Sequence, residues 1–313
     1  MWLTVLAVAG ALVLDAALGE PPEQLHPVAW FGRAIGPFDA DWRRPDVAGG
    51  CAALLLPAVA ALTVAALVLG AGSAAPVAAA AVAAAGLFVS TSLRRLLARV
   101  SEVVALTERH PGNARDRLRT LAGRDAADLS PAQVRSAAVE SLAENLADGL
   151  VRPLAGFAVP AAVVGLAGGG PVVVLAAGAG GAAWVKAVNT LDSMLGYRDK
   201  PVGRAPARLD DAVMWLPARA SAVLLAAVGR APGALRAART GAGGVTSPNS
   251  GWPMATLAAA LEVRLEKPGA YVLNADASLP DTGAARAAVR QVAVAGVLAY
   301  VLAGAAVGVA AWS

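Results

Sequence analysis

Three carboxylates recur every four residues in the segment VESLAENLADG, residues 139–149. Glu140, Glu144 and Asp148 would share one face of an α-helix. Like charges at this spacing destabilise an isolated helix, so a bound cation or an arginine cluster would offset their repulsion. Mg²⁺ binds proteins through one or two carboxylates together with substrate phosphates. The spacing therefore predicts a metal face, with Glu144 also a candidate base. A solvated acidic helix face is the alternative, and the spacing leaves both open.

A second polar group closes an apolar run, in KAVNTLDSMLGYR, residues 186–198. On a helical wheel the polar residues occupy one arc and the apolar residues the other. Polar residues that enter a membrane helix are costly and usually face a cavity or a partner. We predict that Lys186 and Asp192 take part in catalysis, with Asp192 also a metal ligand. The alternative is an interfacial helix end with a snorkelling lysine.

A third group is ARLDDAVMWLPAR, residues 207–219. Asp210 and Asp211 are adjacent and point in different directions on a helix, so at most one faces the second group. Both are candidate metal ligands. Arg208 and Arg219 suit bidentate binding of phosphate or carboxylate. The alternative for one aspartate is a helix N-terminus, where acids complement the dipole.

Two further segments are rich in turn-forming residues. SPNSGWP, residues 247–253, predicts a rigid turn whose exposed backbone N–H groups could cradle an anion, although turns commonly have this composition. HPVAWFGRAI, residues 26–35, holds His26 extended before a proline. His26 is a candidate base or ligand, and a structural histidine packed by Trp30 is the alternative. The remaining candidate substrate-binding and phosphate-binding residues are Arg33, Asn145, Asn189, Thr190, Ser193, Arg198, Ser247, Asn249 and Ser250.

The elements that must position these groups are apolar helices. The chain has 313 residues and is 57% hydrophobic but only 15% charged, whereas soluble domains are nearer a quarter charged. A helix needs about 20 apolar residues to cross a bilayer. The apolar runs are 2–18, which we interpret as a retained helix, then 48–70, 74–91, 150–167, 170–188 and 289–312. No strand pattern of period two stands out. We expect an all-α, polytopic membrane protein with about six transmembrane helices and helical polar loops, as a single domain over 1–313.

The run 212–229 is ambiguous because it contains Pro217 and Arg219. A central arginine costs roughly 2.5–3.5 kcal/mol on insertion scales, so we expect this run to be re-entrant or interfacial. The polar segments would then form one active site at one membrane face.

Several classes of function lack their sequence signatures. There is neither a G-x-x-x-x-G-K-[ST] loop nor a G-x-G-x-x-G turn opening a helix, so a nucleotide would need an unfamiliar arrangement. One cysteine and two histidines are too few for a cysteine-based or histidine-rich metal site. No basic stripe with interleaved aromatics is present, so nucleic acid is not an expected partner.

These motifs, in this order, resemble the CobD/CbiB family, the adenosylcobinamide-phosphate synthases of cobalamin biosynthesis. The resemblance covers almost the whole chain. It is carried by LGEPP with HPVAWFGRAI, by GRDAADLS at 123–130, by VESLAENLADG followed by Pro153, and by KAVNTLDSMLGYR, ARLDDAVMWLPAR and SPNSGWP. Six strings in register are highly specific.

The resemblance implies an ATP-dependent acid–amine ligase. It would join (R)-1-amino-2-propanol or its O-phosphate to the f propionate of adenosylcobyric acid, a corrinoid substrate, with ATP and Mg²⁺ expected. The expected surroundings are the bacterial inner (plasma) membrane and its lipid, with other cobalamin-pathway enzymes as candidate partners. Because ATP is cytoplasmic, we expect the motif loops on the cytoplasmic side.

The sequence departs from the family pattern in three places. The stretch from Tyr197 to Arg208 is a few residues short and lacks an aromatic near Pro201, Met214 replaces a usual Asn, and Met254 replaces a usual Glu. Two other classes remain as alternatives. A membrane transporter would explain polar helix ends and glycine-broken spans. A membrane-embedded, metal-dependent prenyl or phospho-alcohol transferase would explain the aspartates, although their spacing does not form two tidy metal-binding motifs.

Overall fold

The computed structural model describes residues 2–122, 126–197, 199–245 and 247–309, and this part of the chain is almost entirely helical. Its α-helices are α1 (Trp2–Leu18), α2 (Pro27–Ile35), α3 (Pro45–Ala74), α4 (Pro76–Ser90), α5 (Leu93–Arg109), α6 (Pro111–Ala122), α7 (Pro131–Leu146), α8 (Arg152–Leu166), α9 (Pro171–Leu195), α10 (Arg204–Val228), α11 (Ala234–Gly241), α12 (Gly251–Ala260) and α13 (Thr282–Val309). Short turns of other helical types are η1 (Glu23–Leu25), η2 (Gly36–Phe38), η3 (Ala147–Val151), η4 (Pro201–Gly203) and η5 (Ala242–Gly244). The expected all-α class is confirmed.

Six helical stretches among the described residues are long and apolar enough to cross a membrane. They are Pro45–Ala74, Pro76–Arg109, Pro131–Leu166, Pro171–Leu195, Pro201–Val228 and Thr282–Val309. The number matches the expectation, but the set differs. Helix α1 has 17 residues and is apolar but shorter than these six. The chain is a multi-pass membrane protein by the length and composition of its helices.

Proline and glycine set many of the helix boundaries. Helices α3, α4, α7 and α9 each begin with a proline in the first turn, where its missing N–H costs nothing. The glycines at 168–170 separate α8 from α9. Ser130 caps α7 through a capping box with Gln133.

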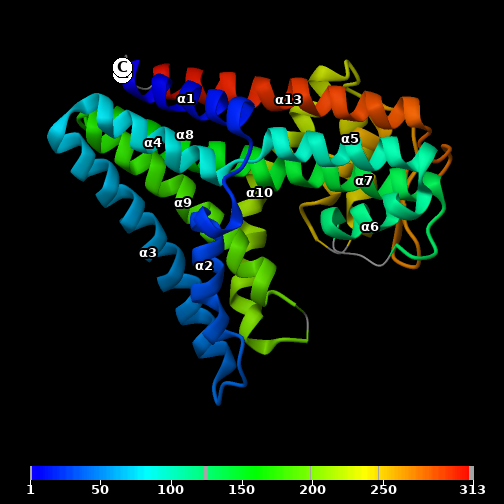
Figure 1. The fold of residues 1–313 in the computed structure, drawn as a ribbon, viewed down its shortest axis with the longest axis horizontal. Helices are drawn as coiled ribbons and strands as arrows, with labels where there is room; N and C mark the ends of the chain where they lie inside the picture. Colours follow the sequence, from blue (N-terminus) through cyan, green and yellow to red (C-terminus); the bar gives the residue numbers. More distant parts are fainter. Residues whose placement is uncertain (1, 123–125, 198, 246, 310–313) are drawn as a thin grey trace. The chain divides into compact units, whose positions relative to one another are not determined.

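The chain divides into two compact units, each built from distant segments. The first comprises the described residues up to Ser92, together with Arg152–Met214 and the chain from Ala299 onward. In it α9 packs against α3, α4 and α8, while α1 packs on α4 and α2 packs on α9 (Figure 1). A Cβ atom on Gly181 would lie 2.2 Å from the carbonyl oxygen of Gly156, so the backbones of α8 and α9 touch there.

The second unit comprises Leu93–Val151 and Trp215–Leu298. Helix α7 packs against α5, α6 and α12, and a two-stranded hairpin covers its first turns (Figure 1). The strands are β1 (Leu265–Lys267) and β2 (Tyr271–Leu273), antiparallel with Glu266 opposite Val272. This hairpin was not expected from the sequence, because strands of three residues are too short to show a period of two. The expectation of one domain over 1–313 stays a prediction.

Two boundaries expected from the sequence are wrong. The stretch that includes 150–167 begins at Pro131, so the segment VESLAENLADG, expected on a helix in the polar segment before this run, lies in the same helical stretch as the run. Helix α10 is continuous through Pro217, whose ring is accommodated inside the helix, so a re-entrant break at 212–229 is ruled out. An interfacial course for α10 stays a prediction.

Candidate functional site

In the first unit, His26 begins α2 and serves as its N-cap. Its Nδ1 accepts a hydrogen bond from the backbone N–H of Val28 at 3.2 Å. This bond places the proton of the neutral ring on Nε2. Partial burial lowers the pKa of His26 below its ordinary value, and the nearby positive charge of Lys186 lowers it further. His26 is therefore a neutral capping residue whose Nε2–H can donate, and the structural interpretation of this histidine is supported by the capping bond.

Helix α2 packs directly on the polar end of α9. Ile35 of α2 and Leu191 and Leu195 of α9 are fully buried together with Ala52 and Ala53 of α3. The apolar arc of KAVNTLDSMLGYR thus faces the protein core, as the helical wheel predicted. The polar arc is partly open: Lys186, Asn189, Thr190 and Asp192 are half-buried and Ser193 is exposed.

Lys186 and Thr190 line a cavity of 400 Å³ whose other walls are mostly apolar, apart from Thr63 and Ser90. Pro27, Trp30 and Phe31 of the α2 segment contribute to those walls, with residues of α3 and α4. The Thr190 hydroxyl donates to the Lys186 carbonyl oxygen at 2.9 Å, and the Ser193 hydroxyl donates to the Asn189 carbonyl oxygen at 2.8 Å. The Thr190 and Ser193 hydroxyls therefore hydrogen-bond to their own helix, as does the Ser90 hydroxyl, which donates to the Gly86 carbonyl oxygen at 2.8 Å. Lys186 is the charged residue among those that line this cavity.

Asp192 is held where α9 ends. A Cβ atom on Gly196 would lie 1.9 Å from Oδ1 of Asp192, so only glycine allows the carboxylate to lie against the backbone at this position. The Gly196 N–H also donates to the Asp192 carbonyl oxygen at 2.7 Å. Arg198, the last predicted residue of this motif, lies outside the described residues.

Asp210 forms an ion pair with Arg152, a residue that the sequence analysis did not single out. The Arg152 side chain is 1% exposed and that of Asp210 is 14% exposed. The pair links the start of α8 to α10 within the first unit. An arginine inside an apolar membrane segment is itself a signal of function or pairing, and that signal was available in the sequence. Asp211 is half-buried, whereas Arg208 and Arg33 are exposed.

In the second unit, three polar residues interrupt a buried stretch of helix. From Ser136 to Val151 every residue is buried except Glu144, Asn145 and Asp148, which are half-buried. The helix widens into a π-helical turn at Ala147–Val151, a local feature found frequently at functional sites. A solvated acidic face would leave the neighbouring residues exposed as well. The arrangement instead presents Glu144, Asn145 and Asp148 as a small polar opening in an otherwise packed helix.

Glu140 differs in its surroundings from Glu144 and Asp148, although the four-residue spacing grouped the three acids. It is 1% exposed. Its Oε1 accepts a hydrogen bond from the Ser136 hydroxyl at 3.1 Å, and its Oε2 accepts one from the Tyr271 hydroxyl at 2.8 Å. Both carboxylate oxygens therefore bind protein donors, and the bond from Tyr271 joins α7 to the β hairpin.

The residues described here do not gather into a group of three or more histidine, cysteine or acidic side chains able to hold a metal ion. A Mg²⁺ ion that keeps waters and substrate phosphates needs only one or two carboxylates. Glu144 and Asp148 fit that mode, because both lie at the polar opening of the helix. They are the residues that would hold the ion in this unit.

The SPNSGWP segment folds as a turn at the start of α12. The Ser247 hydroxyl oxygen accepts hydrogen bonds from the N–H groups of Asn249 at 3.2 Å and Ser250 at 3.4 Å. The expectation that these amides are exposed for an anion is wrong, because the turn's own serine satisfies them. Asn249 is 1% exposed and Ser250 7%, so the segment is a buried connection rather than an open cradle.

Arg219 brings the third and fourth motifs together. Its Nη1 donates to Oδ1 of Asn249 at 2.9 Å and to the carbonyl oxygen of Trp215 at 2.8 Å. Its guanidinium carbon lies 4.4 Å from the ring centroid of Trp215 and 4.9 Å from that of Trp252. Two aromatic faces and one amide oxygen therefore fix its orientation, while its other nitrogens stay available for an anionic ligand.

Met254 also lies near this group. Its sulfur is 4.0 Å from the Tyr271 hydroxyl that donates to Glu140. It is buried, as is Met214. The two methionines that depart from the family pattern are thus packed inside the protein, and Met254 lies against the tyrosine that donates to Glu140.

Comparison with known proteins agrees with the resemblance seen in the motifs. The model of the family described as CobD/Cbib protein matches residues 8–303. A probable cobalamin biosynthesis protein CobD of Methanothrix thermoacetophila is 33% identical over 306 residues, which cover 93% of each chain. The cobalamin biosynthesis protein CobD of Klebsiella pneumoniae is 36% identical over 86% of this chain and 84% of its own.

A relative named cobalamin biosynthesis protein CbiB, from Salmonella paratyphi B, is 34% identical over 86% of this chain and 84% of its own. No solved structure matches the chain. The family match spans nearly all of the chain and includes all six motif strings. The chain belongs to the CobD/CbiB family.

Proposed function

We propose that this protein is an enzyme of cobalamin biosynthesis that forms an amide bond. It would join (R)-1-amino-2-propanol or its O-phosphate to the f propionate carboxylate of adenosylcobyric acid, with ATP activating the carboxylate. The role in cobalamin biosynthesis rests on family membership and on the names of relatives that cover nearly the whole chain. The observation that carries the finer proposal is the polar opening of Glu144, Asn145 and Asp148 in a buried helix.

The chemistry requires activation, because a carboxylate does not condense with an amine in water. In the proposed reaction a propionate oxygen attacks the γ-phosphorus of ATP and ADP leaves. The amine nitrogen then attacks the acyl carbon of the resulting acyl phosphate, loses a proton to a base, and phosphate leaves. Such steps need cationic groups that stabilise the transferred phosphoryl group.

The residues of each unit support roles in these steps. In the second unit Glu144 and Asp148 would hold Mg²⁺, which supplies charge neutralisation at the phosphates when bound. Glu144 is also the proposed acceptor of the amine proton. Arg219, oriented by Trp215 and Trp252, is the proposed anion ligand of this unit.

In the first unit Lys186 is the proposed cation for a phosphate or carboxylate. It is half-buried beside His26 and lines a largely apolar cavity, which strengthens an ionic interaction relative to water. Asp192, Asn189 and the exposed Arg208 would orient polar groups of the substrates. His26, neutral and capping α2, would donate from Nε2 rather than act as a base.

One assay tests the proposal against both alternatives. Purified protein is supplied with adenosylcobyric acid, ATP, Mg²⁺ and either aminopropanol or its phosphate, and the product mass is measured. We expect a mass equal to the sum of acid and amine minus water, with one ADP released for each amide. No amide with either amine, together with ATP-independent movement of a corrinoid across vesicles, would favour a transporter. Transfer of a prenyl or phospho-alcohol group would favour the transferase.

The proposed site is on the cytoplasmic side of the plasma membrane, since ATP is available there. Labelling of introduced cysteines from either side of the membrane tests this sidedness.

A further inference from the structure

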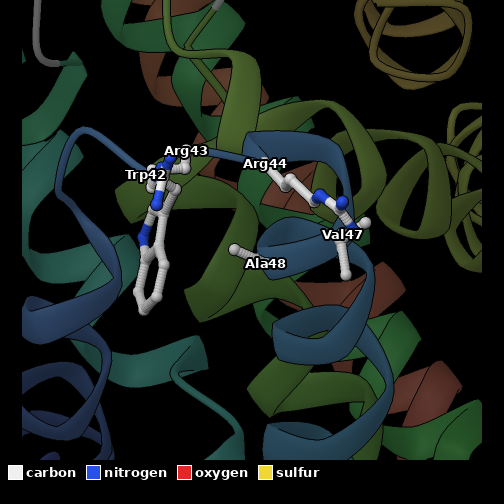
Figure 2. A pocket seen from close by; sticks show the side chains of 5 residues that line it. All are labelled: Trp42, Arg43, Arg44, Val47 and Ala48. Atoms are coloured by element: carbon white, nitrogen blue, oxygen red, sulfur yellow. The ribbon is translucent and has the colours of Figure 1, made fainter.

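An open cavity of 760 Å³ lies at the start of α3, away from the residues assigned above. It is lined by Trp42, Arg43, Arg44, Val47 and Ala48. Figure 2 shows Trp42 and Arg43 on one side of this cavity, Arg44 and Val47 on the other, and Ala48 between them. The lining thus combines two guanidinium groups, one large aromatic ring and two small apolar side chains. We call it the α3 basic cavity.

The positive charge of the α3 basic cavity is not neutralised by nearby acids of the described chain. Asp39 is paired with Lys200 at 2.7 Å, and Asp46 is paired with Arg204 at 3.5 Å. Asp41 is exposed, and it is absent from the residues that line the cavity. Within the part of the chain that the structure describes, neither Arg43 nor Arg44 makes an ion pair, and Arg44 does not cap α3 with its side chain. Two adjacent guanidinium groups are therefore available to an anion.

The position of the cavity along α3 indicates where it lies in a membrane. In the apolar window of α3 only 22% of residues are buried within the protein, the lowest share among the six candidate spans. Its exposed face carries Leu54, Leu55, Val59 and Leu62. A surface of this kind is stable in lipid and not in water. Val47 and Ala48 of the α3 basic cavity lie about two turns before Leu54, so the cavity lies at the end of this apolar face, toward the membrane interface.

Trp42 has the features of a residue at the membrane interface. It is 44% exposed, and its indole N–H donates to the carbonyl oxygen of Phe38 at 3.0 Å. Its ring centroid lies 6.1 Å from that of Phe38. Amphipathic aromatic rings concentrate at headgroup level, and basic pockets beside membrane helices bind anionic headgroups.

We propose that the α3 basic cavity binds the phosphate diester of an anionic phospholipid, with Arg43 and Arg44 on the phosphate and Trp42 against the glycerol region. Guanidinium groups suit phosphate because they present several donors in a planar fork. The shared chemistry is a phosphate group, which a free phosphate ion could also supply. The lipid is favoured because the cavity opens next to the lipid-facing side of α3, where Val47 and Ala48 continue the apolar surface.

The test measures lipid binding to the full-length protein in a neutral detergent by native mass spectrometry. Phosphatidylglycerol and phosphatidylcholine are titrated separately, and inorganic phosphate is added in a third arm. We expect the wild type to bind phosphatidylglycerol more tightly than phosphatidylcholine. The double variant Arg43→Ala with Arg44→Ala should weaken phosphatidylglycerol binding at least about tenfold, because each charge-assisted bond to phosphate contributes measurably to affinity. Its affinity for phosphatidylcholine should change little.

The matched control is Arg236→Ala with Arg239→Ala, which removes two exposed arginines from α11. It should leave the preference for phosphatidylglycerol intact. An equal loss in this control, or no loss in the Arg43 and Arg44 variant, would overturn the proposal. Displacement of bound phosphatidylglycerol by millimolar inorganic phosphate would overturn the assignment to lipid. If the double variant does not insert, Arg43→Gln and Arg44→Gln serve singly; each should weaken binding severalfold, and full binding in both would also refute the site.

Discussion

Tyr271 of the β hairpin donates its hydroxyl hydrogen to Oε2 of Glu140 on α7, across 2.8 Å. The same carboxylate accepts from Ser136, whose hydroxyl oxygen also accepts from the backbone N–H of Glu266 at 2.8 Å. This buried network ties the hairpin to the helix. Glu140 therefore serves the packing of the second unit, while Glu144, one turn further, reaches the polar opening.

The first prediction separates these two glutamates. Glu144→Gln and Asp148→Asn should each lower the rate of amide formation at least about a hundredfold, because general bases and phosphate-binding metal ligands contribute factors of this size. Their melting temperatures should remain near that of the wild type. Glu140→Gln should keep most of the activity but lower stability, because a charged acceptor of two buried hydrogen bonds is worth about 1.5–3 kcal/mol per bond.

Product formation by mass and thermal unfolding in detergent are measured on the same preparations. Wild-type rates in both the Glu144 and Asp148 variants would restore the interpretation of a passive acidic face. A fully inactive but stable Glu140→Gln protein would place Glu140 in the chemistry after all.

The second prediction concerns Lys186. Lys186→Ala should raise KM for the phosphorylated substrate at least about tenfold, whereas Lys186→Arg should keep much of the affinity by retaining the charge. Lys186→Ala should also move the pKa of His26 upward, since the Lys186 charge contributes to lowering it. It should not restore the ordinary value, because burial is the larger cause.

With only two histidines in the chain, the His26 titration can be followed by the ring resonances in a specifically labelled sample. Unchanged kinetics in Lys186→Ala, combined with an unchanged His26 titration, would leave Lys186 as an anchor at the membrane surface.

The third prediction concerns capping and pH at His26. His26→Ala should lower stability by about 0.5–2 kcal/mol through the lost cap, whereas His26→Asn should keep most of it, because asparagine caps well. The pKa of His26 is lowered in the folded state, so the unfolded chain takes up the proton first as pH falls. The stability contribution of neutral His26 is thus fully present above its unfolded pKa of about 6.5, and is lost as pH falls through the folded-state value.

Melting temperature is measured from pH 5 to pH 8 for the wild type, His26→Asn and, as a control, the exposed His110→Asn. The decline in melting temperature toward acid pH should become smaller in His26→Asn and persist in His110→Asn. A decline that persists equally in both variants would assign the pH effect to other groups.

The fourth prediction concerns the Arg152–Asp210 ion pair. Asp210→Ala leaves a buried arginine without its carboxylate, so we expect a loss of about 3–5 kcal/mol. The double variant Arg152→Met with Asp210→Leu should recover most of that stability, because no charge remains buried. Thermal unfolding of Arg152→Met, Asp210→Leu and the double variant completes the cycle.

The same cycle tests a metal role for Asp210. If the pair is structural, amide formation should return together with stability in the double variant. A stable double variant without activity would instead make Asp210 part of the reaction.

Local patterns predicted much of this fold. Long apolar runs marked α3, α4, α9 and α13, because the composition of a run is a local property of the sequence. The wheel of residues 186–195 identified its buried arc for the same reason. The family resemblance then assigned to one protein family several motifs that contact one another in the structure, such as those of Arg219 and Asn249.

Features that depend on distant partners were beyond these patterns. Residues 139–149 were expected on a helix in a polar segment between spans, yet this helix is largely buried by α5, α6 and α12 and continues into the next apolar run. The partner of Asp210 is 58 residues away, and nothing near Asp210 identifies it. Nor does the composition of SPNSGWP reveal that the Ser247 hydroxyl accepts hydrogen bonds from the backbone N–H groups of Asn249 and Ser250.

The fifth prediction is that cysteines introduced at Thr120 and Ser247 are labelled from the same side of the membrane in a Cys51→Ala background. Arg135, in the first turns of α7, donates to the carbonyl oxygen of Pro280 at 2.8 Å and to the Thr107 hydroxyl at 3.1 Å. The end of α5, the start of α7 and the segment that leads into α13 therefore meet at one place.

Helix α6, which carries Thr120, connects α5 to α7 at this end. Gln133 of α7 also bonds to Glu266 at 3.0 Å, and the hairpin that holds Glu266 follows directly from α12 and the Ser247 turn. Helix α12 is only 10 residues long, about 15 Å, so it is too short to carry Ser247 across a bilayer core of about 30 Å.

A membrane-impermeant thiol reagent applied to intact and to inverted vesicles reads the side of each cysteine. If both cysteines are labelled from the same side, the chain between them crosses the membrane an even number of times. Two of the three candidate spans that the described residues form between them then cross, and α10 has an interfacial course despite its length. Labelling from opposite sides would contradict that course and make α10 a full span.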